Sequence, residues 1–181
     1  DKDVLSPAAE EVLAEAVRIL DQFPDEKLVL EGFQAGLSWL TILKKREGFR
    51  NAFDDFDFRK IALYNGEKIQ ELLSDEKIIR NKLKIRATIN NAQKFLEIID
   101  EYGSFDAYIW KFTDGRTIHN SWTDEKELPA STELSDRVSM DLKERGLKVV
   151  GSTIIYAYMQ AAGMVNDHIT SCFRYTELTG S

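Results

Sequence analysis

The sequence predicts an all-α fold made of one domain. Apolar residues recur at helical spacing in many stretches, and 43% of the 181 residues are apolar, which is enough to fill one core. The chain has only three prolines and ten glycines, too few for a sandwich of short strands joined by tight turns. We therefore expect residues 1–181 to form a single helical domain.

The first predicted helix covers residues 8–23. Ser6 provides a side-chain cap, and Pro7 stands at the first helical position, where its missing N–H costs nothing. Pro24 is expected to end this helix. Its broad apolar face consists of Val12, Leu13, Ala16, Val17, Ile19 and Leu20.

The stretch 30–49 predicts one buried helical stripe. Its apolar members at helical spacing are Leu30, Leu37, Leu40 and Leu43. Gly32 and Gly36 interrupt the stripe, and a residue without a side chain lets another backbone or a flat ligand come close.

Glu31 lies within this apolar pattern. A buried carboxylate without partners costs several kcal/mol or takes up a proton. Glu31 must then meet buried N–H groups or hold the donors of a ligand. The alternative is that the buried face is misjudged and Glu31 lies in water, and the pattern by itself leaves both open.

The middle of the chain predicts packing elements. Phenylalanines at 49, 53, 56 and 58 are expected to form a cluster between helices and not a platform for stacking bases. A short helix is expected over 67–73, and a long amphipathic helix over 87–102 that ends at Gly103. Basic residues at 80, 82, 84 and 86 spread round more than one helical face, so solvated charge and phosphate contact both remain open.

Two further helices surround a short turn bounded by glycines. Ser131 and Thr132 introduce a helix over 133–145, and the segment Gly146–Gly151 joins it to a helix that starts at Ser152 or Thr153. The unpaired N–H groups at that second start can bind a phosphate, and Lys148 adds attraction. The spacing fits a helix-hairpin-helix, but it fits a simple antiparallel helix pair as well.

Charge and cysteine content limit the class of protein. The net charge is −7, and residues 1–31 carry −6 of it. The remaining 150 residues carry only −1, so they can contain local basic clusters that bind phosphate. No apolar run is long enough to cross a membrane, and no basic-then-apolar pattern stands at the start, so we expect neither a membrane span nor a leader. With a single cysteine, Cys172, we expect a cytoplasmic protein.

The block LEGFQAGLSWLTILKKREGFRNAF, which starts at Leu30, resembles the signature of the DNA-3-methyladenine glycosylase I family. The resemblance continues through IIRNKLKIRATINNA and through the segment that ends in MVNDH, and it covers residues 27–175. Residues 1–26 form a segment outside the resemblance, because they lack the Cys–Trp pair and the Tyr-His-Asp-x-x-Trp-Gly segment with which the family opens.

The resemblance implies a helix-hairpin-helix glycosylase fold and removal of 3-methyladenine from double-stranded DNA, without a lyase step. It implies that Glu31 accepts hydrogen bonds from the base and stabilises positive charge. Trp39 would form an aromatic wall of the base pocket, with Gln34 and Ser38 as polar neighbours. It also implies that the hairpin binds the DNA backbone through Gly146, Lys148, Gly151, Ser152 and Thr153, and we expect a monomer.

The resemblance also raises a question of zinc. His168 and Cys172 are four residues apart, so a helix would place them on one face as two ligands of a tetrahedral site. In the family the matching pair binds zinc together with a Cys and a His of the opening segment. The other histidine, His119, lies elsewhere and no second cysteine exists, so we expect no cofactor, and His168 and Cys172 form a vestigial half-site.

A second function, of another class, follows from the unmatched N-terminal segment. Its dense Ala, Glu and Leu pattern with clean capping suits a redesigned helix. Such a chain would be an engineered or inactivated scaffold or binder, in which the helix replaces the zinc staple by hydrophobic contact and remodels the base pocket.

Overall fold

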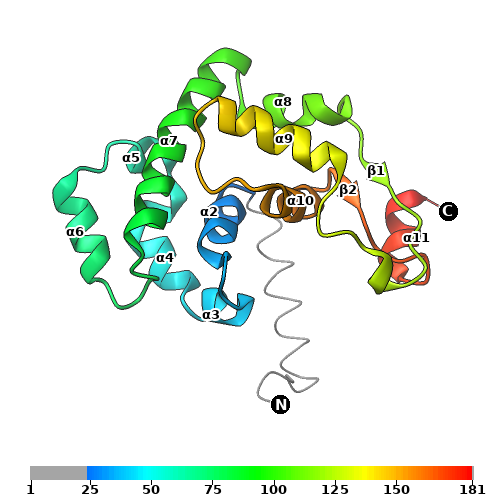
Figure 1. Ribbon diagram of the computed structural model, residues 1–181, viewed down its shortest axis with the longest axis horizontal. Helices are drawn as coiled ribbons and strands as arrows, with labels where there is room; N and C mark the ends of the chain where they lie inside the picture. The colour runs from blue at the N-terminus through cyan, green and yellow to red at the C-terminus, as the bar shows by residue number, and fades with distance from the viewer. Residues whose placement is uncertain (1–23, 181) are drawn as a thin grey trace.

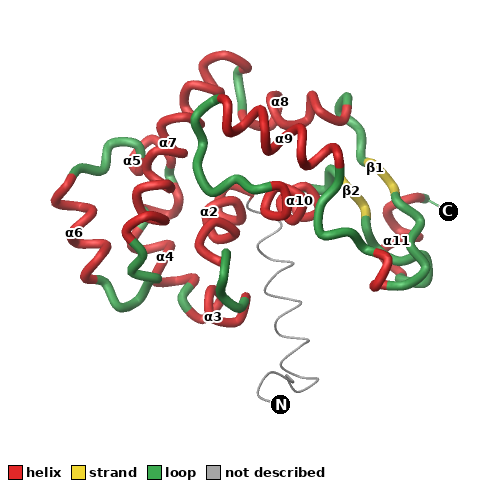
Figure 2. The backbone as a smooth tube through the Cα atoms, viewed as in Figure 1, coloured by secondary structure: helices red, strands yellow, loops and turns green. Residues whose placement is uncertain are grey.

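The computed structural model describes residues 24–180, and the helix predicted over 8–23, with its expected contacts, lies outside the described residues. Within residues 24–180 the fold is helical and carries one short two-stranded sheet, as Figure 2 shows. The all-α prediction is confirmed, because the strands comprise two residues each. None of the helices between residues 24 and 180 combines the length and apolar character that a membrane crossing requires.

The first half of the described chain contains helices of very different length. They are α2 (Pro24–Gln34), α3 (Trp39–Lys44), α4 (Arg46–Ala52), the 3₁₀ turn η1 (Asp54–Phe56), α5 (Phe58–Ile61), α6 (Gly66–Ser74) and α7 (Lys82–Tyr102). Pro24 begins α2, a position that suits its fixed φ and missing N–H. The prediction that Pro24 ends the preceding helix concerns residues outside the described range.

The second half contains the hairpin and the sheet. Its elements are α8 (Phe105–Trp110), the 3₁₀ turn η2 (Lys111–Thr113), β1 (Ile118–His119), the 3₁₀ turn η3 (Glu125–Glu127), α9 (Glu133–Glu144), α10 (Ser152–Ala161), β2 (Val165–Asn166) and α11 (Phe173–Thr179). The strands β1 and β2 pair in parallel, with Ile118 opposite Val165 and His119 opposite Asn166.

Helices α2 and α10 pack together at the centre of the molecule (Figure 1). On one side of this pair lie α4 to α7, where α5 packs on α7, and on the other side lie the sheet and α11. Helix α9 packs against α10 above the pair in this view. The two central helices therefore separate a purely helical half from a half that contains the strands.

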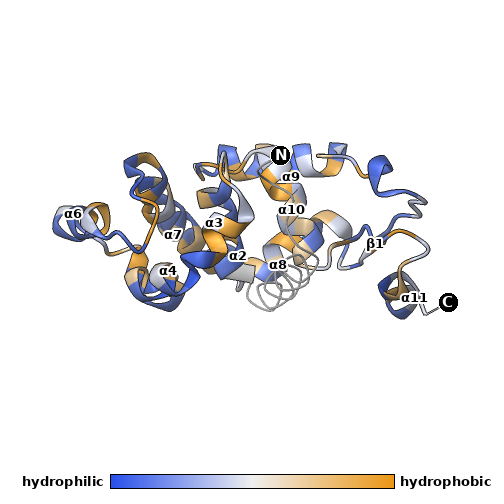
Figure 3. Ribbon diagram, turned by 90° about the horizontal axis from the view of Figure 1, so that it is seen from below, coloured by the Kyte–Doolittle hydropathy of each residue, from blue (hydrophilic) through white to orange (hydrophobic). Residues whose placement is uncertain are grey.

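The core runs through this centre. The four phenylalanines at 49, 53, 56 and 58 are all buried, which confirms the predicted packing cluster. Phe33 of α2 joins them, with its ring centre 4.7 Å from that of Phe49. Figure 3 shows hydrophobic stretches of α3, α8 and α10 toward the middle of the molecule, whereas α11 stands at the far end.

The stripe predicted over 30–49 is divided between two helices. Helix α2 ends at Gln34, and Gly36 takes a φ of +81°, a left-handed conformation that glycine adopts without strain. The chain then reverses, and Ser38 starts α3 by accepting a hydrogen bond from the Thr41 N–H. Leu30 is fully buried, but Leu37 and Leu40 are half-buried, so the prediction of one continuous stripe is wrong.

Local signals placed the end of α7 and the start of α9 correctly. Gly103 ends α7 in the left-handed conformation, and Thr132 caps α9 through the Ser135 N–H. The start of α7 differs, because Asn81 caps it and the helix begins at Lys82 instead of 87. Lys84 of this first turn does not lie in solvent, since its Nζ donates to the carbonyls of Phe33 and Ala35 at 2.9 and 2.6 Å.

Candidate active site

The described residues enclose an open cavity of about 730 Å³ between α2, α3, α8, the sheet, the end of α10 and α11. This volume lies in the range of pockets that hold small molecules. Its lining residues come from all parts of the fold: Lys27, Glu31, Trp39, Trp110, Thr117, His119, Leu128, Ala157, Gln160, Ala161, Ala162, Gly163, Val165, Asn166, Asp167, His168 and Leu178. The cavity mixes an aromatic and aliphatic wall with a few polar groups, as ligand sites do.

Three side chains form the α2 corner of the cavity. Lys27 and Glu31 are one helical turn apart, and the Lys27 Nζ lies 3.5 Å from Glu31 Oε1. The same Nζ lies 4.5 Å from the ring centre of Trp39, the first residue of α3. Glu31 and Lys27 are only 3% and 4% exposed, so each lines the wall through a small part of its surface.

The turn between α2 and α3 brings this corner together. The Gln34 Nε2 donates to the Leu37 carbonyl at 2.7 Å, and the Ser38 hydroxyl lies 2.8 Å from that of Thr41. Lys84 holds the carbonyls at the end of α2, and its burial lowers the pKa of the ammonium. The two predicted polar neighbours, Gln34 and Ser38, thus stabilise the turn and are not among the side chains that line the cavity.

Asp167 also lines the cavity, and sequence reasoning gave it no role. Its Oδ1 accepts hydrogen bonds from the Asn120 amide and the Trp122 indole N–H, both at 2.7 Å. Its Oδ2 accepts from the Tyr156 hydroxyl at 2.5 Å and the Gln160 amide at 2.7 Å. Burial by itself would raise the pKa of Asp167, but these four hydrogen bonds outweigh it and lower the pKa.

The signal that could have revealed Asp167 is its position two residues after the apolar pair Met164 and Val165. Met164 and Val165 are both buried. A charged residue close to a buried segment must find hydrogen-bond partners. The partners themselves lie 7 to 47 positions away, so the sequence does not identify them.

The hairpin between α9 and α10 has the predicted form. Gly146 takes a φ of +92° just after α9, and Gly151 stands before the first residue of α10, Ser152. Among the described residues no side chain caps the N–H groups of α10, and the first turn of this helix contains no acidic residue. Thr153 and Lys148 are exposed. The positive end of this helix is therefore available to an anion.

Two asparagines of α7 fix the hairpin, and sequence reasoning missed both. Asn91 accepts from the Lys148 N–H at 2.7 Å and donates to the Lys148 carbonyl at 2.8 Å. Asn90 donates to the Gly146 carbonyl at 2.9 Å. These bonds join residues more than 50 positions apart, so no local pattern signals them.

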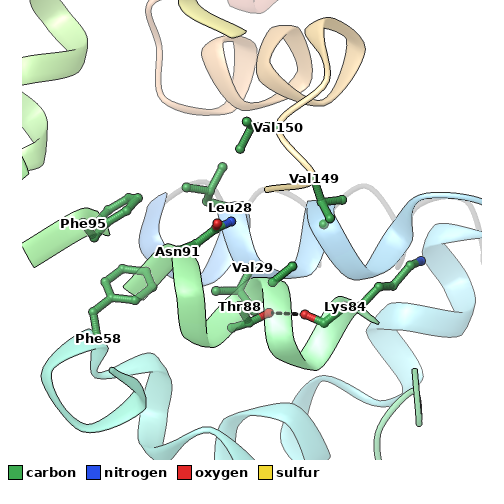
Figure 4. A pocket seen from close by; sticks show the side chains of 11 residues that line it. Leu28, Val29, Phe58, Lys84, Thr88, Asn91, Phe95, Val149 and Val150 are labelled. Atoms are coloured by element: carbon green, nitrogen blue, oxygen red, sulfur yellow. Dashed lines mark hydrogen bonds between the residues drawn. The ribbon is translucent and has the colours of Figure 1, made fainter. Parts of the chain in front are cut away.

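Between the hairpin and the two helices below it lies a second, very small cavity of about 20 Å³ (Figure 4). Val149 and Val150 of the hairpin face Leu28 of α2 and Asn91 of α7 across it. A volume of this size holds about one water molecule. The hairpin thus packs directly on α2, the helix that carries Glu31.

His168 and Cys172 lie together, but not on a helix. Residues 167–172 form an irregular turn, and the Sγ of Cys172 lies 3.8 Å from the Nδ1 of His168. The helical arrangement assumed from their spacing is therefore wrong, although the two side chains do meet. Nowhere in residues 24–180 do three or more side chains of the His, Cys, Asp or Glu type gather as a metal site would require.

Comparisons with known proteins decide the family. The sequence model of the methyladenine glycosylase family matches residues 21–175, which is most of the chain. The chain belongs to the methyladenine glycosylase family. The match starts at residue 21, whereas the resemblance was expected to begin at residue 27.

Individual members of the methyladenine glycosylase family agree with this match. DNA-3-methyladenine glycosylase 1 of Escherichia coli is 44% identical over 150 residues, which cover 83% of this chain and 80% of that protein. DNA-3-methyladenine glycosylase of Haemophilus influenzae is 41% identical over 147 residues, covering 81% and 80%.

A solved structure resembles the fold closely. It is the crystal structure of a tyrosine-to-phenylalanine variant of 3-methyladenine DNA glycosylase I in complex with 3-methyladenine, with a TM-score of 0.80 and 33% identity. The similarity covers 83% of this chain and 81% of that one. The helix-hairpin-helix glycosylase fold predicted from the sequence is therefore confirmed.

Proposed function

We propose that this protein is a monofunctional DNA glycosylase that hydrolyses the N-glycosidic bond of 3-methyladenine in DNA. The observation that carries the proposal is the position of Glu31 and Trp39, a carboxylate and an indole that line one cavity. The chain also belongs to a family whose relatives are named for this activity.

The chemistry needs modest help from the protein. A base methylated at N3 is cationic within the nucleotide, so it is already a good leaving group. When the bond between C1′ and the base breaks, its electron pair moves to the base and cancels the positive charge. The oxygen of a water molecule joins C1′, one proton passes to solvent, and an abasic site remains.

Glu31 and Trp39 would bind the extruded base. An enzyme that acts on a base must take it out of the helix stack into a pocket. The Glu31 carboxylate can accept a hydrogen bond from the amino group of the base and stabilise its charge, because a partly buried carboxylate interacts more strongly than one in water. Trp39 offers a ring on which a flat base stacks.

The hairpin would hold the DNA backbone. The N–H groups at the start of α10, at Ser152 and Thr153, can bind a phosphate without a net basic charge. Lys148 is exposed in the hairpin that Gly146 and Gly151 bound, and these residues would contact the DNA backbone. We propose that the substrate is double-stranded DNA with alkylated adenine and that the enzyme acts as a monomer, because one chain supplies both the cavity and the hairpin.

We also propose that the protein holds no structural zinc. The sequence has a single cysteine and two histidines, and only His168 and Cys172 lie together. A structural zinc site needs four ligands, so this pair by itself does not fit one. A lone cysteine also suits a reducing compartment, and we propose a cytoplasmic location.

The activity is tested with duplex DNA that carries radiolabelled methyl groups on adenine N3. Released 3-methyladenine is separated from DNA and counted. Glu31→Gln should lower the rate by about 100-fold or more, the scale expected for one electrostatic contact to the reacting group. Glu67→Gln, which changes an exposed carboxylate on α6, is the matched control and should retain full activity.

No release by the wild-type protein would refute the proposed function. Equal rates for Glu31→Gln and the wild type would remove Glu31 from the mechanism while leaving the activity in place. Both variants are first checked for cooperative thermal unfolding, so that loss of activity is not confused with loss of the fold.

A further inference from the structure

The start of α7 lies in a strongly basic part of the chain. Residues 77–96 contain six lysines and arginines and no aspartate or glutamate, so this stretch carries +6 in a chain whose net charge is −7. Domains that bind nucleic acid have their lysines and arginines clustered on one face or along a helix. The sequence left solvated charge and phosphate contact both open for these residues, and their positions in the structure distinguish the two.

The structure separates the basic side chains by what they contact. The Lys84 ammonium points inward and donates to two backbone carbonyls near the end of α2. Arg80 has a carboxylate beside it, with its Nη1 3.6 Å from Glu76 Oε1. Lys82 and Arg86 are exposed, and the side chain of neither forms an ion pair or a hydrogen bond with any of residues 24–180. These two are the cations of the cluster that the described part of the chain leaves available to an external anion.

The N-terminal end of α7 is not itself the binding group. The Asn81 side chain accepts hydrogen bonds from the backbone N–H groups of Leu83 and Lys84, at 3.0 and 3.1 Å. These N–H groups are thus already satisfied by the chain. An anion at this surface would be held by the charged side chains of Lys82 and Arg86.

Lys82 and Arg86 belong to a row that leads to the hairpin. The row consists of residues spaced four apart along α7: Lys82, Arg86, Asn90 and Lys94. Side chains four apart on a helix are neighbours, with about 5–6 Å between their Cβ atoms. Asn90 donates to the Gly146 carbonyl at 2.9 Å, and a Cβ placed on Gly146 would lie 3.2 Å from Cε of Lys94. Arg86 therefore stands one helical turn from the point where α7 holds the hairpin.

We propose that Lys82 and Arg86 bind phosphates of double-stranded DNA next to those bound by the hairpin. This inference rests on the proposed function, which brings the DNA backbone to the start of α10. The hairpin supplies backbone N–H groups, and the row on α7 supplies positive charge that displaces counterions from the DNA. The two side chains touch no base, so they raise the affinity for any duplex and add no preference for sequence or damage.

The test measures how duplex binding depends on salt. A short fluorescein-labelled duplex without damaged bases is titrated in fluorescence anisotropy at salt concentrations between about 50 and 200 mM. Lys82→Gln, Arg86→Gln and the double variant remove the charges and keep residues that favour a helix. The matched control combines Arg116→Gln with Arg137→Gln, which removes the same charge from exposed positions before β1 and on α9. Thermal unfolding first confirms that every variant is folded.

Each phosphate contact contributes about 0.9 to the slope of log K against log salt concentration. The slope should therefore become shallower by about 0.9 in each single variant and by about 1.8 in the double variant, which should also lose about tenfold or more in affinity near 0.1 M salt. The control should keep the wild-type slope. An unchanged slope in the double variant, or an equal change in the control, would overturn the proposal, because the two charges would then act only through the net charge of the protein.

Single-turnover release of 3-methyladenine from duplex DNA gives a second readout. In the double variant the protein concentration that gives the half-maximal rate should rise by about tenfold, in line with the lost affinity. The maximal rate should stay within about twofold of the wild type, because the backbone contact is the same before and during the reaction. A large fall of the maximal rate with unchanged half-saturation would contradict a role in binding the backbone.

These results are separate from the test of activity. Binding of undamaged duplex needs no bond cleavage, so the change in slope decides the role of Lys82 and Arg86 even if the wild type releases no base. Release of 3-methyladenine combined with an unchanged slope in the double variant would support the proposed function and refute the contact on α7. No binding of duplex by the wild type would refute both.

Discussion

Replacing Asp167 by asparagine should destabilise the fold through the hydrogen bonds that it breaks. The carboxylate accepts four of them, two on each oxygen, from Asn120, Trp122, Tyr156 and Gln160. An asparagine amide must turn its NH₂ group toward one pair of these donors, which loses both bonds of that pair. Hydrogen bonds to a charged group contribute about 1.5–3 kcal/mol each, so the free energy of unfolding should fall by about 3–6 kcal/mol.

The same substitution should change how stability depends on pH. The pKa of Asp167 is lowered in the folded protein, since its four hydrogen bonds outweigh the opposing effect of burial. Its contribution is therefore fully present above the unfolded pKa of about 3.9 and is lost as the pH falls toward the lower folded pKa. Asp167→Asn lacks this group, so its stability should decline less steeply than that of the wild type in this acidic window.

The assay is urea unfolding followed by circular dichroism at neutral pH and at several acidic pH values. Asp100→Asn, an exposed position on α7, is the control and should stay within about 0.5 kcal/mol of the wild type. A loss below about 1 kcal/mol in Asp167→Asn, the size of one ordinary hydrogen bond, would refute the reasoning. It would show that the structure relaxes around the amide or that water replaces the lost partners.

Three further outcomes are expected. Asn91→Ala removes both hydrogen bonds to the Lys148 backbone. Fluorescence anisotropy should show that this variant loses more affinity for duplex DNA than for free 3-methyladenine. Equal losses of the two affinities would contradict a role of the hairpin in binding DNA. Gly48→Ala should lower the melting temperature, because its Cβ would lie 2.4 Å from the Lys77 carbonyl oxygen. An Ala Cβ at Gly32 in α2 would meet no atom of residues 24–180 within 4 Å, so Gly32→Ala should raise stability by up to about 1 kcal/mol; a loss of stability in this variant would contradict the steric reasoning. Elemental analysis should find less than one zinc per chain, and a chelator should leave the melting temperature unchanged; one tightly held zinc would prove the zinc proposal wrong.

The sequence by itself determined the helical class, the packing role of the phenylalanines and the position of some helix ends, such as the end of α7 and the start of α9. These features depend on short-range physics: the spacing of apolar residues over a few turns, a side-chain cap, or a glycine such as Gly103 in a left-handed conformation. The apolar residues around Glu31 also indicated that its carboxylate lies away from bulk water, although a solvated position remained open. The resemblance to a family then gave the hairpin and the pocket their expected roles.

Only the tertiary structure decided which groups meet. The turn at Gly36 divides the apolar stretch between two helices and places Trp39 beside the ammonium of Lys27, a residue whose part in the pocket no local pattern revealed. The bonds of Asn91 to the hairpin and of Asn120 to Asp167 cross 57 and 47 positions of the chain. Such contacts depend on how distant helices pack, and that packing is fixed by the burial of the whole core and not by the residues next to each partner in the sequence.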